Sequence, residues 1–307
     1  MSVLPIGGEP PRPPASKRVR RALLAILEKF EEAADRTRRL ADPEAIHDLR
    51  VAIRRLSAAL SLWRGTLREP PRRKAVRRLR RLRRALGAAR ELEVHVADLE
   101  PRSGVQSFVL RLQLAEWVGG LRREMERARH HAATHVSARR IRRIVRPVKR
   151  AARTLAGDAT AATLPAADER LAIVAAKARE AMIVAATLGD DESLHAARVA
   201  TKKWRYSIEA ADAAEARDAK PHAGPAVLRD VQRALGEVQD RATLRQRLVA
   251  YATQLREQNL GAQAASLGPL IAEIDGERRT AVETFLRLTP VLTEPPSDPV
   301  RILPDST

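Results

Sequence analysis

Apolar residues recur every three or four positions along almost the whole chain, the spacing that places them on one face of a helix. After residue 47, for example, one side of the predicted helix carries Leu49, Ile53, Leu56 and Leu60. Clusters of proline, glycine and aspartate interrupt this pattern. Between them it predicts helices at about residues 16–40, 43–67, 72–99, 105–155, 166–188, 191–218, 226–258 and 262–289. We therefore expect an all-α fold, with a kink at Pro147 in the fourth helix.

The chain contains an internal repeat. The segment HDLRVAIRRL, which begins at His47, is echoed by HAARVATKKW, which begins at His195. A second pair, RRALGAARELEV from Arg83 and QRALGEVQDRAT from Gln232, follows in the same order and at nearly the same spacing. The repeat predicts a tandem duplication of a four-helix unit. The expected divisions are a tail over 1–15, a first bundle over 16–157, a linker over 158–165, a second bundle over 166–290 and a proline-rich tail over 291–307.

Each of the repeated histidine helices has one strongly basic face. We expect them to begin at the N-caps Asp42 and Asp190. The basic face of the first comprises His47, Arg50 and Arg54, and that of the second His195, Arg198, Lys202 and Arg205. The helix that follows the first carries a wider stripe, made of Arg73, Arg77, Arg80, Arg81 and Arg84. Its counterpart in the second half keeps Arg229 and Arg233.

The overall charge of the chain indicates what kind of ligand these basic faces would bind. The chain has 57 Lys and Arg against 38 Asp and Glu, a formal net charge of +19, which favours a polyanionic partner. Stacked like charges cost roughly 0.2–0.5 kcal/mol per pair, and few acids interrupt the stripe, so an external anion would make the arrangement favourable. Arginine offers a planar fork that matches two phosphate oxygens, and a histidine beside it gains charge when a phosphate raises its pKa. A solvated face that binds nothing is the alternative interpretation.

The absence of cysteine excludes disulfides, thiolate zinc sites and cysteine nucleophiles. The chain shows neither a signal peptide nor an apolar run of about 18 residues that could span a membrane. We therefore expect a cytoplasmic protein without a cofactor.

The repeated motifs resemble those of the CHAD family, the conserved histidine α-helical domain. The resemblance rests on HDLRVAIRR from His47, HAARVATKKWRY from His195 and the glycine-centred LGAARELEV and LGEVQDRAT, and it covers nearly all of residues 16–290. It implies two four-helix bundles related by pseudo-twofold symmetry and a basic central groove that binds inorganic polyphosphate, often on polyphosphate or storage granules. The departures are mild: Glu91 replaces the usual aspartate, Gln239 a common asparagine, and two alanines follow His195 where a leucine is usual.

Other segments carry weaker signals. The segment SARRIRRIVRPVKR either extends the anion-binding surface or forms a solvated outer face, with Arg139, Arg142, Arg143, Arg146 and Arg150 on one side. His131 and His135 have a spacing that can hold a metal, but without a third ligand we expect exposed polar residues and no metal site. We expect Trp63, Trp117 and Trp204 to pack in the core.

The sequence therefore predicts a binding protein for inorganic polyphosphate that is not an enzyme. The first alternative is a basic helical protein that binds nucleic acid, although only 3% of the residues are aromatic and could stack on bases. The second is a polyphosphatase or triphosphatase. The string ELEVH from Glu91 falls short of the ExExK strand motif of the triphosphate-cleaving domains fused to some family members, and it lies on a predicted helix.

Overall fold

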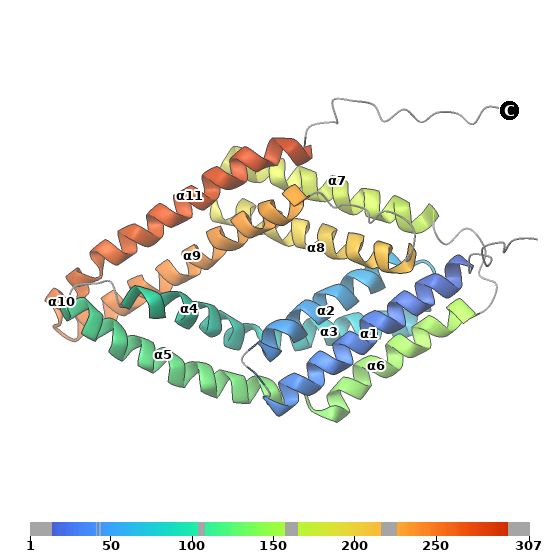
Figure 1. Ribbon diagram of the computed structural model, residues 1–307, viewed down its shortest axis with the longest axis horizontal. Coiled ribbons are helices and arrows are strands. Elements are labelled where there is room, and N and C mark those ends of the chain that lie inside the picture. Colours follow the sequence, from blue (N-terminus) through green and yellow to red (C-terminus); the bar gives the residue numbers. More distant parts are fainter. Residues whose placement is uncertain are drawn as a thin grey trace, which may run out of the picture. The chain divides into compact units, whose positions relative to one another are not determined.

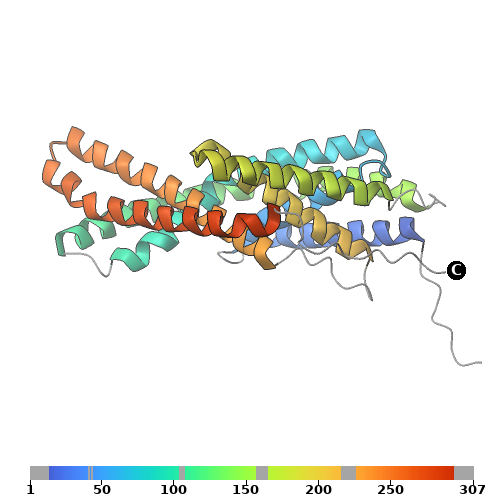
Figure 2. The same ribbon diagram turned by 90° about the horizontal axis from the view of Figure 1, so that it is seen from above.

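A computed structural model describes residues 14–40, 42, 44–103, 108–156, 165–215 and 226–293 of the protein. Every regular element in these ranges is a helix, which confirms the predicted all-α fold (Figures 1 and 2). The elements are α1 (Ala15–Arg39), α2 (Ala45–Leu62), α3 (Glu69–Ala85), α4 (Gly87–Ser103), α5 (Phe108–Thr134), α6 (Ala138–Ala152), the 3-10 helix η1 (Arg153–Ala156), α7 (Pro165–Leu188), α8 (Asp191–Glu215), α9 (Ala226–Glu257), α10 (Gly261–Ser266) and α11 (Gly268–Thr293).

Three of the predicted helices are each divided in the structure. The helix expected over 262–289 is interrupted at Leu267, between α10 and α11. The helix expected over 72–99 breaks at Leu86, where the backbone leaves helical geometry and α4 begins at Gly87. The helix expected over 105–155 breaks after Thr134, because residues 135–136 form a turn and Ser137 is extended. Pro147 lies inside α6, so the break falls before it, and the kink expected at that proline stays a prediction.

The two predicted N-caps behave differently. Asp190 caps α8, because its carboxylate accepts a hydrogen bond from the backbone N–H of Ser193 at 2.7 Å. Asp42 does not cap α2, which begins later, at Ala45. Its carboxylate instead accepts hydrogen bonds from the guanidinium of Arg36, at 2.7 and 3.1 Å.

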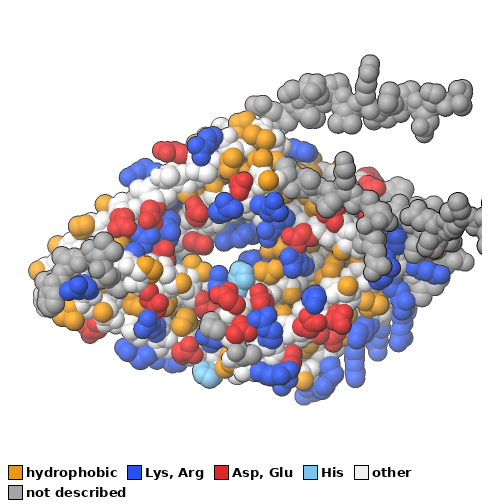
Figure 3. Space-filling model, in the orientation of Figure 1, with side chains coloured by type: hydrophobic (Ala, Val, Ile, Leu, Met, Phe, Trp, Pro, Cys, Tyr) orange, Lys and Arg blue, Asp and Glu red, His pale blue; other side chains and the backbone are white. Residues whose placement is uncertain are grey.

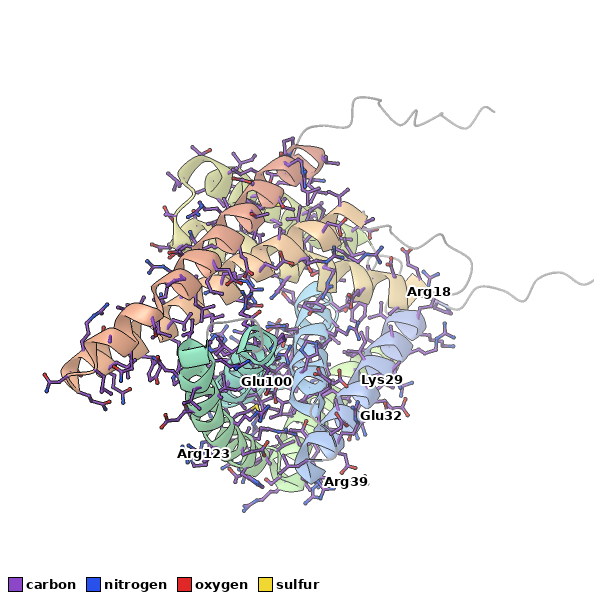
Figure 4. The ribbon with its side chains drawn as sticks, turned by 60° about the vertical axis from the view of Figure 1, so that its left-hand side comes forward. Arg18, Lys29, Glu32, Arg39, Glu100 and Arg123 are labelled. Atoms are coloured by element: carbon purple, nitrogen blue, oxygen red, sulfur yellow. The ribbon has the colours of Figure 1, made fainter. Side chains whose placement is uncertain are left out.

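Contacts between residues divide the chain into two compact units, and one helix can contribute residues to both units. Unit 1 comprises residues 1–90, 128–171 and 206–221. In it α1 packs on α2 and α6, and α3 packs on α2 and α6 (Figure 1). The core contains Leu23, Leu27, Phe30 and Trp63, all with at most 1% of their surface exposed. The outer face of α1 is charged, and Figure 4 shows Lys29, Glu32 and Arg39 along this helix.

Unit 2 comprises residues 91–127, 172–205 and 222–307. Its longest helices, α9 and α11, lie side by side and are connected through α10 (Figures 1 and 2). The side chain of Gln113 in α5 donates a hydrogen bond to the Gln263 carbonyl in α10 at 3.1 Å. Arg102 in α4 pairs with Glu277 in α11 at 2.7 Å, so polar contacts tie the shorter helices to the long pair.

These units differ from the two predicted halves. Segments from both halves contribute to each unit, and α4, α5, α7 and α8 have residues in both. The expected pair of consecutive bundles, 16–157 and 166–290, is therefore not confirmed. The predicted tails and the linker over 158–165 lie largely outside the described residues, although α11 continues to Thr293.

None of the described helices combines the length and the apolar character required to cross a membrane.

Candidate anion-binding site

The first basic face lies on α2, in unit 1. The apolar positions predicted for this helix are buried, which orients the opposite side of α2 outward. His47, Arg50 and Arg54 lie there, and each is half-buried. The guanidinium of Arg50 donates a hydrogen bond to the Arg83 carbonyl in α3, at 3.2 Å. This bond fixes Arg50 beside the arginine stripe of the next helix.

His47 has a lowered pKa. Burial is the main cause, and the charge of Arg90 is the next. Glu44 and Asp48 act against this lowering, and Arg54 adds a smaller effect in the same direction as Arg90. His47 is therefore mainly neutral at pH 7 and has a hydrogen bond to donate. A bound phosphate would act in the opposite direction, because a nearby negative charge favours the imidazolium.

The arginine stripe lies on α3, with Arg73, Arg77, Arg80, Arg81 and Arg84 all exposed. The other side of this helix is buried as predicted, through Ala75, Leu79 and Leu82. Arg73 approaches Glu69 at 3.4 Å. The other four form no ion pair with any residue that the structure describes. Four adjacent cations on one helix face thus lack a counterion in the part of the chain that the structure describes.

Two arginines next to this face were missed by the sequence analysis. Arg83 offers its carbonyl to Arg50, and burial, followed by the charges of Arg54, Arg80 and Arg84, lowers its pKa. Arg90 is the largest charge effect on His47. Both belong to the segment RRALGAARELEV, so the repeated glycine segment was the available signal.

The second basic face lies on α8, in unit 2. His195 is exposed, and its Nδ1 lies 2.7 Å from Oε1 of Gln239 in α9. Because an amide oxygen only accepts, this contact has Nδ1–H as the donor and leaves Nε2 for another partner. Both residues line a small cavity of about 70 Å³. Gln239, which sequence reasoning noted only as a departure from the family pattern, is a positioning residue for His195.

The other basic residues of unit 2 differ in their exposure and in whether an acidic side chain lies near them. Arg198 is half-buried and approaches Asp240 at 3.7 Å, and Lys202 and Arg205 are also half-buried. On α9, Arg229 is exposed, whereas Arg233 pairs with Asp230 at 3.2 Å. Unit 2 therefore presents a basic face that is partly neutralised by its own acids.

The additional candidates fall on α5 and α6. Arg139, Arg142, Arg143 and Arg146 are exposed on α6. Nε2 of His131 in α5 lies 3.3 Å from Nε2 of His135 in the turn that follows, and Arg140 in α6 lies 2.7 Å from Nδ1 of His135. Within the described ranges no three potential metal-ligating side chains form a group.

All three tryptophans were predicted to pack in the core, and the structure confirms this for Trp63 and Trp204. Trp63 and Trp204 are buried, with 1% and 6% of their surface exposed. Trp117 is half-buried and stacks on Tyr251, with ring centroids 4.7 Å apart.

The predicted motifs thus sit on two basic helical faces of an all-α protein. A family model described as the CHAD domain matches residues 21–249. The chain belongs to the CHAD family. This match confirms the resemblance identified from the two histidine motifs.

Solved structures share the CHAD fold. The CHAD domain from the plant Ricinus communis superimposes with a TM-score of 0.63 at 24% identity, over 88% of this chain and 92% of that one. PptA from Streptomyces chartreusis superimposes with a TM-score of 0.60 at 21% identity, over 90% of this chain and 99% of that one. Comparison with curated proteins gives no match.

Proposed function

We propose that this CHAD protein binds inorganic polyphosphate through its basic Arg, Lys and His faces, without catalysing its cleavage. The observation that carries the proposal is the stripe on α3, where Arg77, Arg80, Arg81 and Arg84 lack an ion pair among the described residues. A linear polyanion with one charge or more per phosphate would supply the missing counterions. Membership of the CHAD family adds support, because polyphosphate binding is what the resemblance implies.

The two histidines would play unequal parts in binding. His195 is held through Nδ1 by Gln239, which directs Nε2 away from that contact and makes it available to a phosphate oxygen. His47 lies beside Arg90 and has a lowered pKa, so it would contribute mainly as a neutral donor before ligand binds. The sequence-based expectation that both faces line a single groove remains a prediction.

Docking to polyphosphate or storage granules, which the family resemblance suggests, is compatible with this binding and would follow from it. Nucleic acid is the competing ligand. The buried rings of Trp63 and Trp204 are not exposed for stacking on bases, which favours polyphosphate over single-stranded nucleic acid.

A competition titration tests the proposal. Labelled long-chain polyphosphate is displaced by duplex DNA, RNA and heparin at near-physiological salt, with the wild-type protein beside Arg50→Glu/Arg198→Glu. We expect the wild type to prefer polyphosphate and the variant to lose at least about tenfold in affinity, since charge-assisted hydrogen bonds contribute roughly 1.5–3 kcal/mol each.

The matched control is Arg127→Glu/Arg256→Glu, which makes the same charge change at two exposed positions outside the predicted faces. Equal weakening of the two variants, with equal displacement by every polyanion, would identify a general cationic surface. Release of orthophosphate from polyphosphate in the presence of magnesium would contradict the non-catalytic part of the proposal and support the phosphatase alternative.

A further inference from the structure

A second concentration of positive charge lies between α3 and α6 in unit 1. A pocket of about 470 Å³ opens there, and its polar lining consists of Arg68, Lys74, Arg78, Arg143, Arg146 and Arg150. Of these, Arg143, Arg146 and Arg150 belong to the basic face predicted from the segment SARRIRRIVRPVKR, whereas Arg68, Lys74 and Arg78 do not. Figure 3 shows Lys and Arg side chains gathered at the lower right edge of the view, where α6 lies in Figure 1. The volume is within the range of small-molecule sites, about 300–1,000 Å³.

The backbone of α6 helps to build this pocket. Pro147 has no N–H, so it cannot donate the helical hydrogen bond that the Arg143 carbonyl, four residues earlier, would otherwise accept. The guanidinium of Arg78 in α3 donates a hydrogen bond to that carbonyl. The proline therefore provides an anchor that holds Arg78 against α6.

The cations of the pocket are not neutralised by protein acids. No carboxylate lines it, and among the described residues none of the six forms an ion pair. The nearest acid in sequence, Glu69, is engaged with Arg72 at 3.0 Å and with Arg73 at 3.4 Å. The pKa of Arg78 is lowered by burial and then by the charges of Arg143, Arg77 and Arg81, so its environment is one of mutual repulsion. Six cations held around one concavity call for an external anion of high charge density.

We propose that the pocket between α3 and α6 is a second phosphate site, which binds a short linear oligophosphate of about three phosphates. The remaining lining residues are Pro70, Pro71 and Pro147, so the six cations are the only polar side chains of the pocket, and no lining side chain accepts a hydrogen bond from a base edge. The free oligophosphate and the triphosphate group of a nucleotide share the chemistry that the six cations recognise, and the pocket should not distinguish them by their base. The site rests on α3 and α6 alone and does not depend on the function proposed for the histidine faces.

The experiment uses the full chain carrying Arg50→Glu/Arg198→Glu, so that the repeated arginine of each histidine face no longer contributes. Calorimetric titration with tripolyphosphate should give saturable binding. Adding Lys74→Glu/Arg150→Glu should weaken this binding at least about tenfold, the equivalent of roughly one charge-assisted hydrogen bond. Adding Lys74→Gln/Arg150→Gln, which removes charge without introducing repulsion, should weaken it less. Lys74 and Arg150 are exposed, and circular dichroism with thermal melting verifies that each variant folds.

The matched control is Lys177→Glu/Arg256→Glu in the same background, with both substitutions at exposed positions of unit 2. It should leave tripolyphosphate binding unchanged within about twofold, as expected for charges outside the site. ATP titrated in parallel should bind no more tightly than tripolyphosphate. The absence of saturable binding, or equal loss in the control variant, would overturn the site. A marked preference for ATP would overturn its assignment to the phosphate chain alone.

Discussion

At the scale of single residues, the charged side chains differ in whether an acid compensates them. Arg102 contacts Asp98, Glu273 and Glu277, and only 12% of its side chain is exposed, as is typical of a structural ion-pair network. Arg77 and Arg84 are exposed and lack any such partner among the described residues. The net charge of the protein is therefore not spread evenly, and the uncompensated arginines of α3 are the reason for inferring an external ligand.

Sequence reasoning identified most of the charged faces at this scale but not their supporting contacts. The basic positions of α2, α3 and α8 follow from helical periodicity, because the buried residues of one face determine which residues lie opposite. The contact of Gln239 with His195 and the bond from Arg78 to the Arg143 carbonyl join different helices. Such contacts depend on how helices pack, which a pattern within one helix does not encode.

His95 supplies a prediction about pH. It is 1% exposed in unit 2, with Nε2 3.3 Å from the hydroxyl of Thr243. Burial, and then the charge of Arg247, lower its pKa from 6.5 to about 4, against a smaller opposing effect of Asp98. The folded state thus binds this proton less readily than the unfolded state. Its contribution to stability is present above pH 6.5 and is lost as the pH falls towards 4.

The expected loss between pH 7.5 and pH 4.5 is roughly 2–3 kcal/mol in the free energy of unfolding. Urea unfolding at both pH values measures it, in the wild type and in His95→Gln, which cannot titrate. The wild type should lose more stability than the variant over this interval. An equal loss in the two proteins would show that the acids alone, and not His95, cause the acid sensitivity.

At the scale of the elements, periodicity predicted where helices lie better than where they end. Breakers that change backbone geometry were found, as at Gly189, which has φ of +67° after α7. The breaks at Leu86 and at residues 135–137 carry only short local signals, because Gly87 directly follows the first break and Ser137 is the N-cap residue of α6 at the second, and neither residue was used to predict a helix end. Pro147 had the reverse effect, since α6 retains it and another helix uses the freed carbonyl.

Two glycine substitutions should change stability in opposite directions. A Cβ added at Gly189 or at Gly236 meets no atom within 4 Å, so packing does not distinguish the two positions. Gly189→Ala would place an L-residue in the left-handed region and should destabilise the protein by roughly 1–2 kcal/mol. Gly236→Ala lies inside α9 and should stabilise it by about 1 kcal/mol, because alanine has the higher helix propensity. Thermal unfolding of both variants measures the shifts, and shifts of the same sign would contradict this account.

At the scale of the whole molecule, the sequence predicted the fold class and the family, but the expected division into consecutive halves is not confirmed. The two copies of the repeated motif have the same local structure, because His47 and His195 each lie on the basic face of a helix. The compact units, however, are assembled from alternating segments, and several helices contribute residues to both. Contacts between residues far apart in the chain determine these units, and a single sequence does not contain them.

The salt dependence of binding tests the ligand at this scale. Each phosphate neutralised by a cation releases counterions, so by analogy with nucleic acids the logarithm of affinity should fall by about 0.7–0.9 per log unit of salt for each such contact. Arg77→Gln/Arg84→Gln removes two uncompensated cations of α3 and should reduce the steepness of this dependence by about 1.4–1.8. Titrations of labelled long-chain polyphosphate at several salt concentrations give the slopes. Arg127→Gln/Arg256→Gln, with the same loss of charge at exposed positions outside the predicted faces, should retain the wild-type slope. If all three proteins shared one slope, the stripe on α3 would not contact the phosphates, and the repulsion among its arginines would need another explanation.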